Sequence, residues 1–192
     1  MIEWPAKIRS VRAVEMPCGT VDIYPTVLEL AGAKVEHQPP LDGVSLAGVI
    51  NGKQQQRTKP LGFWVYPTGG KPMRSSAMLT AQMNEPADAP LPAAEGPEQF
   101  ESFEQRPLDV LPGHAALVDN EYKLHRIPGK GMGPAQTDES KVQYKLYNLA
   151  KDPQERNDLA EAQPERLQAM KEALAQWQES VVRSLNGEDY KK

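Results

Sequence analysis

The sequence predicts an α+β protein whose C-terminal part is a small antiparallel β-sheet with one helix packed across it. Two strand-like runs, 114–119 and 122–127, flank a short turn, which is the pattern of a β-hairpin. A third run, 142–149, alternates between the two faces of a strand. The segment 164–185 repeats apolar residues at steps of three and four, as an amphipathic helix does. The residues of this stripe are Leu167, Met170, Leu174, Trp177, Val181 and Leu185.

The ends of this predicted helix follow from its flanking residues. Pro164 stands where a helix can begin, and Asn186-Gly187 ends it. Ordering the helix backbone costs more than burial of the stripe returns, so the helix depends on the sheet beneath it. Five acidic residues precede the helix or lie in its first turn, where they suit the positive end of its dipole. We interpret them as solvated: Asp152, Glu155, Asp158, Glu161 and Glu165.

The chain divides into three predicted parts, which are residues 1–66, 67–113 and 114–192. In the first part, Asp22 is a candidate cap for a helix over Ile23 to Ala31, and Gly32 ends that helix. Its apolar residues at spacings of four, three and one share a face. They are Ile23, Val27, Leu30 and Ala31. An apolar and aromatic run closes this part and predicts a buried strand over 61–66.

The middle part, 67–113, contains eight of the 18 prolines of the chain. One weak helix is predicted over 73–83, and little periodicity follows it. We therefore expect an irregular, exposed insertion or loop. Phe100 and Phe103 are the residues with which it would attach to a neighbouring surface.

Composition excludes several classes of protein. The chain has 192 residues, 26 of them acidic and 22 basic, so no excess of basic side chains points to a nucleic-acid partner. Its uncharged stretches are too short and too polar to predict a membrane span. A single cysteine, Cys18, rules out an internal disulfide and a multi-cysteine zinc site. We expect neither nucleic acid nor membrane among the partners.

The search for catalytic motifs finds few candidates. Cys18 precedes a helix start, but a lone cysteine is usually a small buried apolar residue. No Gly-x-Ser-x-Gly nucleophile motif occurs. The glycines of 129–134 lack the following helix and Lys-Ser/Thr pair of a phosphate loop. Asp119-Asn120 is explained by a turn, whereas calcium needs six or more oxygen ligands. We predict no catalytic residue and no metal ligand in this chain.

The polar side chains of the hairpin are the candidates for ligand binding. His114 and His125 fall directly opposite each other if Asp119-Asn120 is the two-residue turn, and they do not if Asn120-Glu121 is the turn. Two histidines alone make a poor zinc site. They are either two polar groups on one sheet face or, with the Lys123 and Arg126 cations, part of a pocket for an anionic ligand.

Five blocks of sequence stand out together. They are 3–8 (Glu-Trp-Pro-Ala-Lys-Ile), 22–32, 41–46, 122–124 and 145–160. The last block, Lys-Leu-Tyr-Asn-Leu-Ala-Lys-Asp-Pro-Gln-Glu-Arg-Asn-Asp-Leu-Ala, is the most specific because an amphipathic helix follows it. In this order the blocks resemble the later half of the sulfatase family, whose fold is similar to that of alkaline phosphatase.

The resemblance implies a fold for each of the three parts of the chain. Residues 1–66 would be the last segments of the large alkaline-phosphatase-like α/β domain, 67–113 a variable insertion, and 114–192 the C-terminal subdomain. The family nucleophile is a formylglycine made within a Cys/Ser-x-Pro/Ala-x-Arg motif, which the sequence around Cys18 does not match. In the family, the calcium ligands precede the block that corresponds to residues 3–8 of this chain. Met1 would then be an internal methionine, and the chain would be a C-terminal fragment that is inactive alone.

The parent protein implied by this resemblance is a sulfuric ester hydrolase acting on sulfated carbohydrates. It would need calcium and formylglycine, and the partner of this chain would be the missing N-terminal catalytic part. The resemblance implies a periplasmic or secreted parent. We expect His114, Lys123 and His125 to be the residues that touch substrate. The alternative is a stand-alone, non-catalytic interaction or carbohydrate-binding module, and a third reading is an enzyme that uses Cys18 or the histidine pair.

Overall fold

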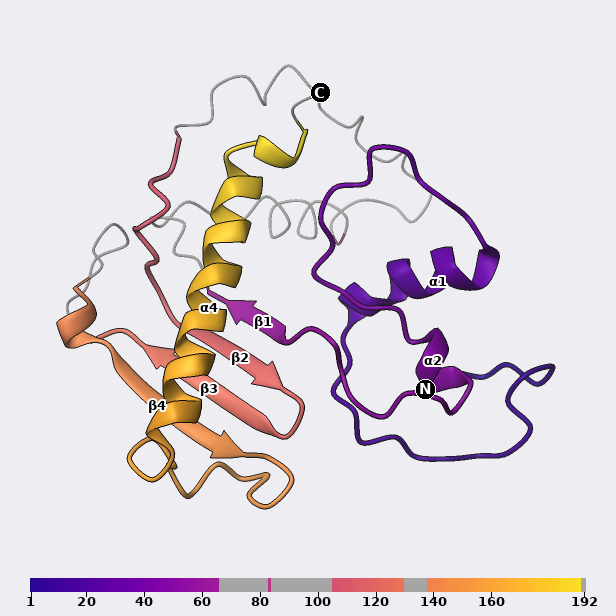
Figure 1. The fold of residues 1–192 in the computed structure, drawn as a ribbon, viewed down its shortest axis with the longest axis horizontal. Coiled ribbons are helices and arrows are strands. Elements are labelled where there is room, and N and C mark those ends of the chain that lie inside the picture. The colour runs from indigo at the N-terminus through magenta and orange to yellow at the C-terminus, as the bar shows by residue number, and fades with distance from the viewer. Residues whose placement is uncertain (66–82, 84–104, 130–137, 191–192) are drawn as a thin grey trace.

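The computed structural model describes residues 1–65, 83, 105–129 and 138–190. Figure 1 shows two halves beside each other, one built from residues 1–60 and one from a sheet crossed by a long helix. We call residues 1–60 the N-terminal segment. It contains a short 3-10 helix η1 (Thr20–Asp22), helix α1 (Ile23–Ala31) and helix α2 (Ala47–Ile50).

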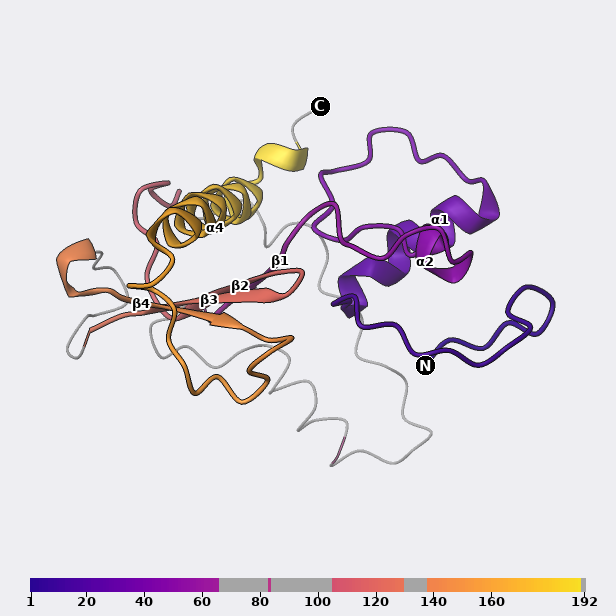
Figure 2. The same ribbon diagram turned by 60° about the horizontal axis from the view of Figure 1, so that its bottom comes forward.

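The second half is a four-stranded antiparallel sheet with one helix. The strands are β1 (Leu61–Trp64), β2 (Ala115–Asp119), β3 (Tyr122–Ile127) and β4 (Gln143–Asn148), in the order β1-β2-β3-β4. Helix α4 (Pro164–Leu185) lies across one face of this sheet (Figure 2). Short 3-10 helices, η3 (Glu139–Lys141) and η4 (Glu188–Tyr190), precede β4 and follow α4. This sheet-and-helix unit confirms the predicted α+β class.

The core of the sheet-and-helix unit lies between α4 and the facing side of β2, β3 and β4. Alternate strand residues point to this side because side chains alternate across a strand. The buried cluster is Ala115, Leu117, Leu124, Leu146, Met170 and Leu174. Two tryptophans extend it, since the rings of Trp64 and Trp177 lie 6.5 Å apart. Gly62 leaves room for this contact, because a side-chain carbon at position 62 would collide with the Trp177 ring.

The stripe predicted for α4 is correct only in its first half. Met170 and Leu174 are buried, but the next buried positions are Gln178 and Val182 rather than the predicted Val181 and Leu185. Three successive steps of four residues make the line of buried side chains drift around the helix, because the α-helical repeat is 3.6 residues. Leu185 is therefore 45% exposed. The buried Gln178 Nε2 has no hydrogen-bond partner among the described residues.

Strand β1 joins the sheet from the N-terminal side of the chain. Leu61 pairs with Val118 and Trp64 pairs with Ala115, so β1 is the edge strand next to β2. The strand predicted at 61–66 therefore belongs to the same sheet as the hairpin, but it ends at Trp64. Its predicted burial is wrong, since Phe63 is 54% exposed and Val65 is 72% exposed. The division at residues 66 and 113 itself stays a prediction.

The N-terminal segment buries Met16, Leu46, Ala47 and Ile50 but leaves the apolar side of α1 exposed. In α1 the buried residue is Thr26, whereas the apolar residues on the outside of the helix are exposed. Their exposed fractions are 58% for Ile23, 46% for Tyr24, 55% for Val27 and 40% for Leu30. The predicted end of the helix is correct, since Gly32 is its left-handed C-cap with φ of 63°. Asp22 occupies the N-cap position, but its side chain makes no capping bond to α1.

Some predictions fall outside the described residues. These are the helix at 73–83 apart from Met83, the insertion at 67–113 apart from residues 83 and 105–113, the contacts of Phe100 and Phe103, and the glycine connector beyond Gly129. Within the described part of the chain, no helix has the length and apolar character needed to cross a membrane.

Candidate functional site

The candidate site lies on the sheet face that points away from α4. Lys123 and His125 of β3 point to this face, because they alternate with the buried Leu124. His125 pairs with Ala116 of β2 and with Lys145 of β4. His114 immediately precedes β2 and points to the same side. The structure thus brings together His114, Lys123 and His125. The placement of Arg126 in the same pocket is wrong, because Arg126 alternates with His125 along β3, is buried and pairs with Glu139.

The hairpin turn decides how the two histidines meet. Asp119 pairs with Tyr122, so Asn120 and Glu121 form the two-residue turn, and Asn120 has the positive φ of 51° that such a turn requires. His114 is therefore diagonal to His125, not directly opposite it. Diagonal neighbours on one face are still within reach of each other. Nε2 of His114 lies 3.3 Å from Nδ1 of His125.

The geometry of this contact is that of a hydrogen bond. The ring centroids of His114 and His125 are 5.6 Å apart, whereas the facing nitrogens are 3.3 Å apart. The centroid separation exceeds the nitrogen separation by about the distance from each ring centre to its own nitrogen. Both nitrogens therefore lie close to the line that joins the two ring centres, and they point at each other. Two metal ligands would instead point toward a common third position. One ring of the pair therefore donates a hydrogen bond to the other.

Glu155 completes the cluster, and the sequence did not identify it as a site residue. Its two carboxylate oxygens contact different partners, Oε1 lying 2.6 Å from Lys123 Nζ and Oε2 lying 2.8 Å from His125 Nε2. The sequence had assigned Glu155 to the solvated acidic residues before α4. The signal that was missed is its place in Asp152-Pro-Gln-Glu, where a turn can aim a carboxylate back at the sheet.

A tight turn holds Glu155 in place. The residue has φ of 55°, a left-handed conformation that is unfavourable for a side chain with a Cβ. Its N–H donates to the carbonyl of Asp152, and the Asp152 carboxylate accepts hydrogen bonds from the N–H groups of Arg156 and Asn157. Further along, the N–H of Leu159 donates to the carbonyl of Leu146 in β4. The turn is thereby tied to the sheet.

The charges of the cluster balance one another. The hydrogen bond from Lys123 is the main cause that lowers the pKa of Glu155, and the contact with His125 adds to it while burial opposes it. The carboxylate is therefore ionised at neutral pH. Burial lowers the pKa of His114, and the nearby His125 and Lys123 lower it further. His114 is thus uncharged at neutral pH, and Lys123 and Glu155 offset each other.

The structure offers no metal centre in its described part. There, no three His, Cys, Asp or Glu side chains lie close enough together to hold a metal ion. Asn120, half of the pair considered for calcium, has a structural role: its Oδ1 accepts a hydrogen bond from the N–H of Arg57 at 2.8 Å. The described residues thus supply no cluster of this kind for the calcium that the family resemblance implies.

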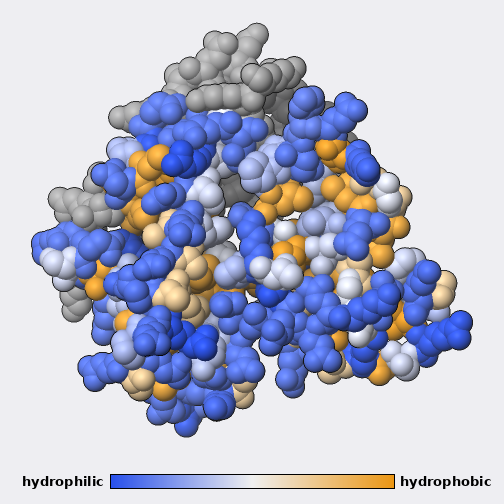
Figure 3. All heavy atoms as spheres, viewed as in Figure 1, coloured by the Kyte–Doolittle hydropathy of each residue, from blue (hydrophilic) through white to orange (hydrophobic). Residues whose placement is uncertain are grey.

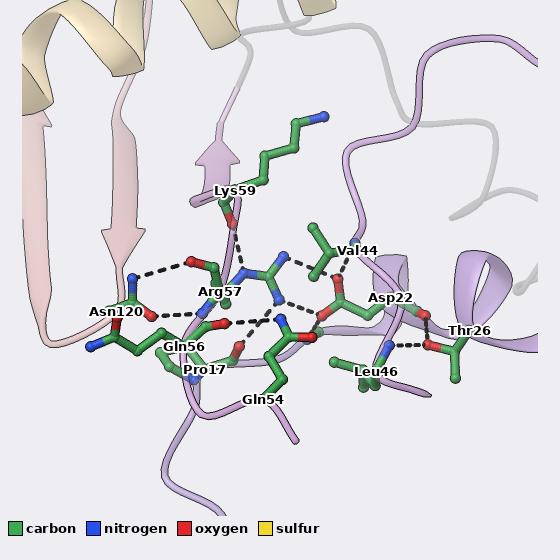
Figure 4. A network of polar contacts seen from close by, with 11 residues as sticks. Pro17, Asp22, Thr26, Val44, Leu46, Gln54, Gln56, Arg57, Lys59 and Asn120 are labelled. Carbon is green, nitrogen blue, oxygen red and sulfur yellow. Dashed lines mark hydrogen bonds and ion pairs between the residues drawn. The ribbon is translucent and has the colours of Figure 1, made fainter. Parts of the chain in front are cut away.

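A second polar cluster organises the N-terminal segment (Figure 4). The guanidinium of Arg57 donates to both carboxylate oxygens of Asp22, at 2.7 and 3.0 Å, and both side chains are fully buried. The same carboxylate accepts hydrogen bonds from the N–H groups of Gly19 and Val44. Burial raises the pKa of Asp22, but these hydrogen bonds outweigh burial and lower the pKa overall. The cluster joins distant parts of the chain and leaves no side chain free for chemistry.

An open groove runs between the two halves. It has a volume of about 1290 Å³ and is lined by Pro40 and Pro60 on one side and by Trp177, Val181 and Leu185 of α4 on the other. Figure 3 shows apolar residues in the hollow between the halves. Trp177 Nε1 donates to Asp42 Oδ1 at 3.0 Å across it. Three residues of the predicted stripe, Trp177, Val181 and Leu185, thus line this groove.

Comparison with known proteins bears on the family resemblance. A stretch of 56 residues is 34% identical to human steryl-sulfatase, and it spans 29% of this chain and 10% of the human protein. No family model matches the chain. This is a sulfatase-like chain that resembles the C-terminal portion of that family, as the five sequence blocks predicted.

Solved structures give weaker likenesses. One comes from a study of glycosaminoglycan metabolism by Bacteroides thetaiotaomicron, with 16% identity, a TM-score of 0.44 and coverage of 82% of this chain and 24% of that one. A second was solved with its substrate D-glucosamine-2-N,6-O-disulfate, with 15% identity, a TM-score of 0.45 and coverage of 89% and 25%. A third is the phosphonate monoester hydrolase of Agrobacterium radiobacter, with 17% identity, a TM-score of 0.40 and coverage of 88% and 24%. Likenesses at this level do not establish a shared fold.

Proposed function

We propose that this chain is the C-terminal part of a sulfatase and that the whole protein hydrolyses sulfate esters of carbohydrates. The observation that carries the proposal is the exposed apolar face of α1, formed by Ile23, Tyr24, Val27 and Leu30. A contiguous apolar face of this kind marks a surface that a partner covers. The similarity to a sulfatase supplies the class of partner, which is the catalytic α/β part of the same protein.

The energetics of the exposed face favour such docking. Complete burial of a large apolar side chain contributes about 1.5–3 kcal/mol, so covering a half-exposed one contributes roughly half of that. Four such side chains on α1 together stabilise a docked state by several kcal/mol. The N-terminal segment gains this stabilisation only when its partner is present.

The chemistry of the whole protein follows from the family resemblance. The nucleophile would be formylglycine, and calcium would stabilise the charge that develops on the sulfate group. Neither group has a matching set of residues in the described part of this chain, so we propose that the chain alone is inactive. Its own contribution would be the polar face of His114, Lys123 and His125, placed beside the substrate.

The experiment compares this chain with a longer polypeptide. The frame encoding the chain is extended upstream through a Cys/Ser-x-Pro/Ala-x-Arg motif, and both proteins are assayed on a fluorogenic sulfate ester with and without calcium. The isolated chain should be inactive in both conditions, and the longer polypeptide should be active. Turnover by the isolated chain, or the absence of such a motif upstream, would contradict the proposal.

A stand-alone binding module is the second candidate. One observation favours it, namely that the sheet-and-helix unit has a closed apolar core of its own. That candidate predicts a monomer with no tendency to associate through α1. Analytical ultracentrifugation distinguishes the two, because the exposed face of α1 should cause concentration-dependent association of the isolated chain, which Val27→Asp should reduce.

A further inference from the structure

We propose that Glu155, His125 and His114 form a hydrogen-bonded relay whose outer nitrogen, Nδ1 of His114, accepts a hydrogen bond from a hydroxyl group of the ligand. The proposal deepens the proposed function and rests on it for the carbohydrate class of the ligand. It differs from the sequence prediction in the group recognised. The site would recognise a sugar hydroxyl rather than a sulfate at neutral pH.

The donors and acceptors of the relay follow from the Glu155 carboxylate, which is its end farthest from the ligand. A carboxylate can only accept, so His125 Nε2, 2.8 Å from Glu155 Oε2, carries a hydrogen. In the uncharged ring, Nδ1 of His125 is then the acceptor, and the facing Nε2 of His114 carries the hydrogen that it donates across 3.3 Å. This tautomer leaves Nδ1 of His114 unprotonated. No other described residue bonds that nitrogen, so its lone pair is available to a ligand donor.

The charge of the cluster selects the kind of ligand. Lys123 is the only cation that contacts the relay among the described residues, and its ammonium lies 2.6 Å from Glu155. That ion pair is partly buried, with side-chain exposures of 25% and 28%. The relay itself carries no unpaired positive charge, and its lone pair suits a hydroxyl donor. Lys145 of β4 faces the relay from the neighbouring strand but is not part of it. Burial is the main cause that keeps His114 in its uncharged form, and the nearby Lys123 adds to it.

The surroundings of the relay suit a sugar ring. Phe63 of β1 is 54% exposed and lies on the same sheet face, in one cross-strand row with Ala116 and His125. Ala116 is small, so the row has an aromatic ring on one side and the imidazoles on the other. A sugar can place its apolar C–H face on an aromatic ring while its hydroxyls reach polar groups. The row therefore offers both kinds of contact.

Protonation would reverse the role of the outer nitrogen. One proton added to the histidine pair reverses the hydrogen bond between the rings, so Nε2 of His114 becomes the acceptor and its Nδ1 carries a hydrogen. The charged groups that face the relay are Lys123 of β3, Lys145 of β4 and the carboxylate of Glu155, with Asp152 and Asp158 near Tyr147. The protonated site would donate to a sulfate oxygen. Preference for a sulfate is thus expected to rise as the pH falls.

The first test measures the tautomers directly. In the 192-residue chain at pH 7.5, two-bond 1H–15N spectra of the histidine rings should show protonated Nε2 and unprotonated Nδ1 for both His114 and His125. Glu155→Ala should mix the tautomers of both rings. Glu161→Ala removes an exposed carboxylate of the same segment and should leave them unchanged. Mixed tautomers in the unmodified chain, or no change in Glu155→Ala, would overturn the relay.

The second test measures the ligand preference. N-acetylglucosamine and its 6-sulfate are titrated separately, and the Nδ1 resonance of His114 is followed. Both sugars should shift it with affinities that agree within about threefold at pH 7.5. In His114→Ala, followed through the ring resonances of His125, binding of the unsulfated sugar should weaken by about three- to tenfold. Binding of the sulfated sugar alone, or of neither sugar, would overturn the proposal. The activity assay of the longer polypeptide tests the proposed function separately, so the two failures are distinguishable.

Discussion

The N-terminal segment and the sheet-and-helix unit bury different kinds of side chain. The unit packs Leu117, Leu124 and Leu174 into an apolar core between a sheet and a helix. The segment buries the Asp22–Arg57 ion pair and Thr26 beside a smaller apolar group, and it leaves the apolar side of α1 exposed. This apolar group is Met16, Leu46, Ala47 and Ile50. One half thus has an apolar core between a sheet and a helix, and the other combines a smaller apolar group with a polar network around one carboxylate. We propose that a partner outside this chain covers the apolar surface of α1.

The largest effect is expected from Asp22→Ala, which leaves the buried guanidinium of Arg57 without its carboxylate. Removing one member of a buried ion pair costs about 3–5 kcal/mol. Amide cross-peaks from the N-terminal segment should collapse in 1H–15N spectra, while those of β2, β3 and β4 remain. The double variant Asp22→Leu with Arg57→Met should recover much of the loss. Uniform unfolding of both halves would show that they do not differ as described.

Leu174→Ala tests the other half, because Leu174 is 1% exposed in the core of the sheet-and-helix unit. Truncating a buried leucine costs about 2–5 kcal/mol. The loss should appear in urea unfolding followed by the fluorescence of Trp64 and Trp177. Leu185→Ala, on the same helix but exposed, should cost less than 1 kcal/mol. Equal losses for the two variants would contradict the observed drift of the buried line along α4.

Gly62→Ala tests the packing where β1 meets α4. The added methyl would collide with the Trp177 ring, and overpacking of this kind costs about 1–3 kcal/mol. The midpoint of thermal unfolding should fall. Gly19→Ala is the matched control, since a methyl there meets its nearest neighbours at ordinary van der Waals distance, and it should change the midpoint little.

Acidification should weaken the N-terminal segment before it affects the apolar core. The pKa of Asp22 is lowered in the folded state from its ordinary value of 3.8. The contribution of ionised Asp22 to the free energy of unfolding is therefore present above pH 3.8, and it is lost as the pH falls below 3.8 toward the lowered pKa. Amide spectra recorded from pH 5 downward should show α1 resonances disappearing first. Asp22→Asn should remove this pH dependence, and an unchanged profile in that variant would assign it to other groups.

The smallest effect in the isolated chain is expected from Val27→Ser, because Val27 is already 55% exposed. Its stability should change by no more than about 0.5 kcal/mol. In the longer polypeptide the same substitution should lower the activity or the yield, since Val27 would lie in the docked face. A loss of stability in the isolated chain as large as that in the longer one would remove the argument for docking.

Local patterns predicted the sheet-and-helix unit well because its elements carry their own signals. The hairpin, β4, the limits of α4 and the left-handed Gly32 all follow from periodicity and turn residues. The second half of the α4 stripe could not be predicted, since the alternative lines through Val181 and Val182 are both consistent with helical spacing. Which line is buried depends on the sheet beneath the helix.

The site was predicted only in part, for a related reason. His114, Lys123 and His125 share a face because strand alternation places them there, and the sequence left two turn registers open. The contacts of Glu155 with His125 and of Asp22 with Arg57 join residues that are 30 or more positions apart in the sequence. No spacing rule connects such residues, so only the fold reveals that they meet. The left-handed conformation of Glu155 is likewise set by the turn around it.

The central claim is that the N-terminal segment lacks its partner in this chain. Native-state hydrogen exchange of the isolated chain tests it most directly, because amide protection reports the free energy of local opening. The account predicts that α1 amides exchange much faster than those of β3 and α4, and that α1 becomes protected in the longer polypeptide. Protection of α1 equal to that of β3 in the isolated chain would contradict it.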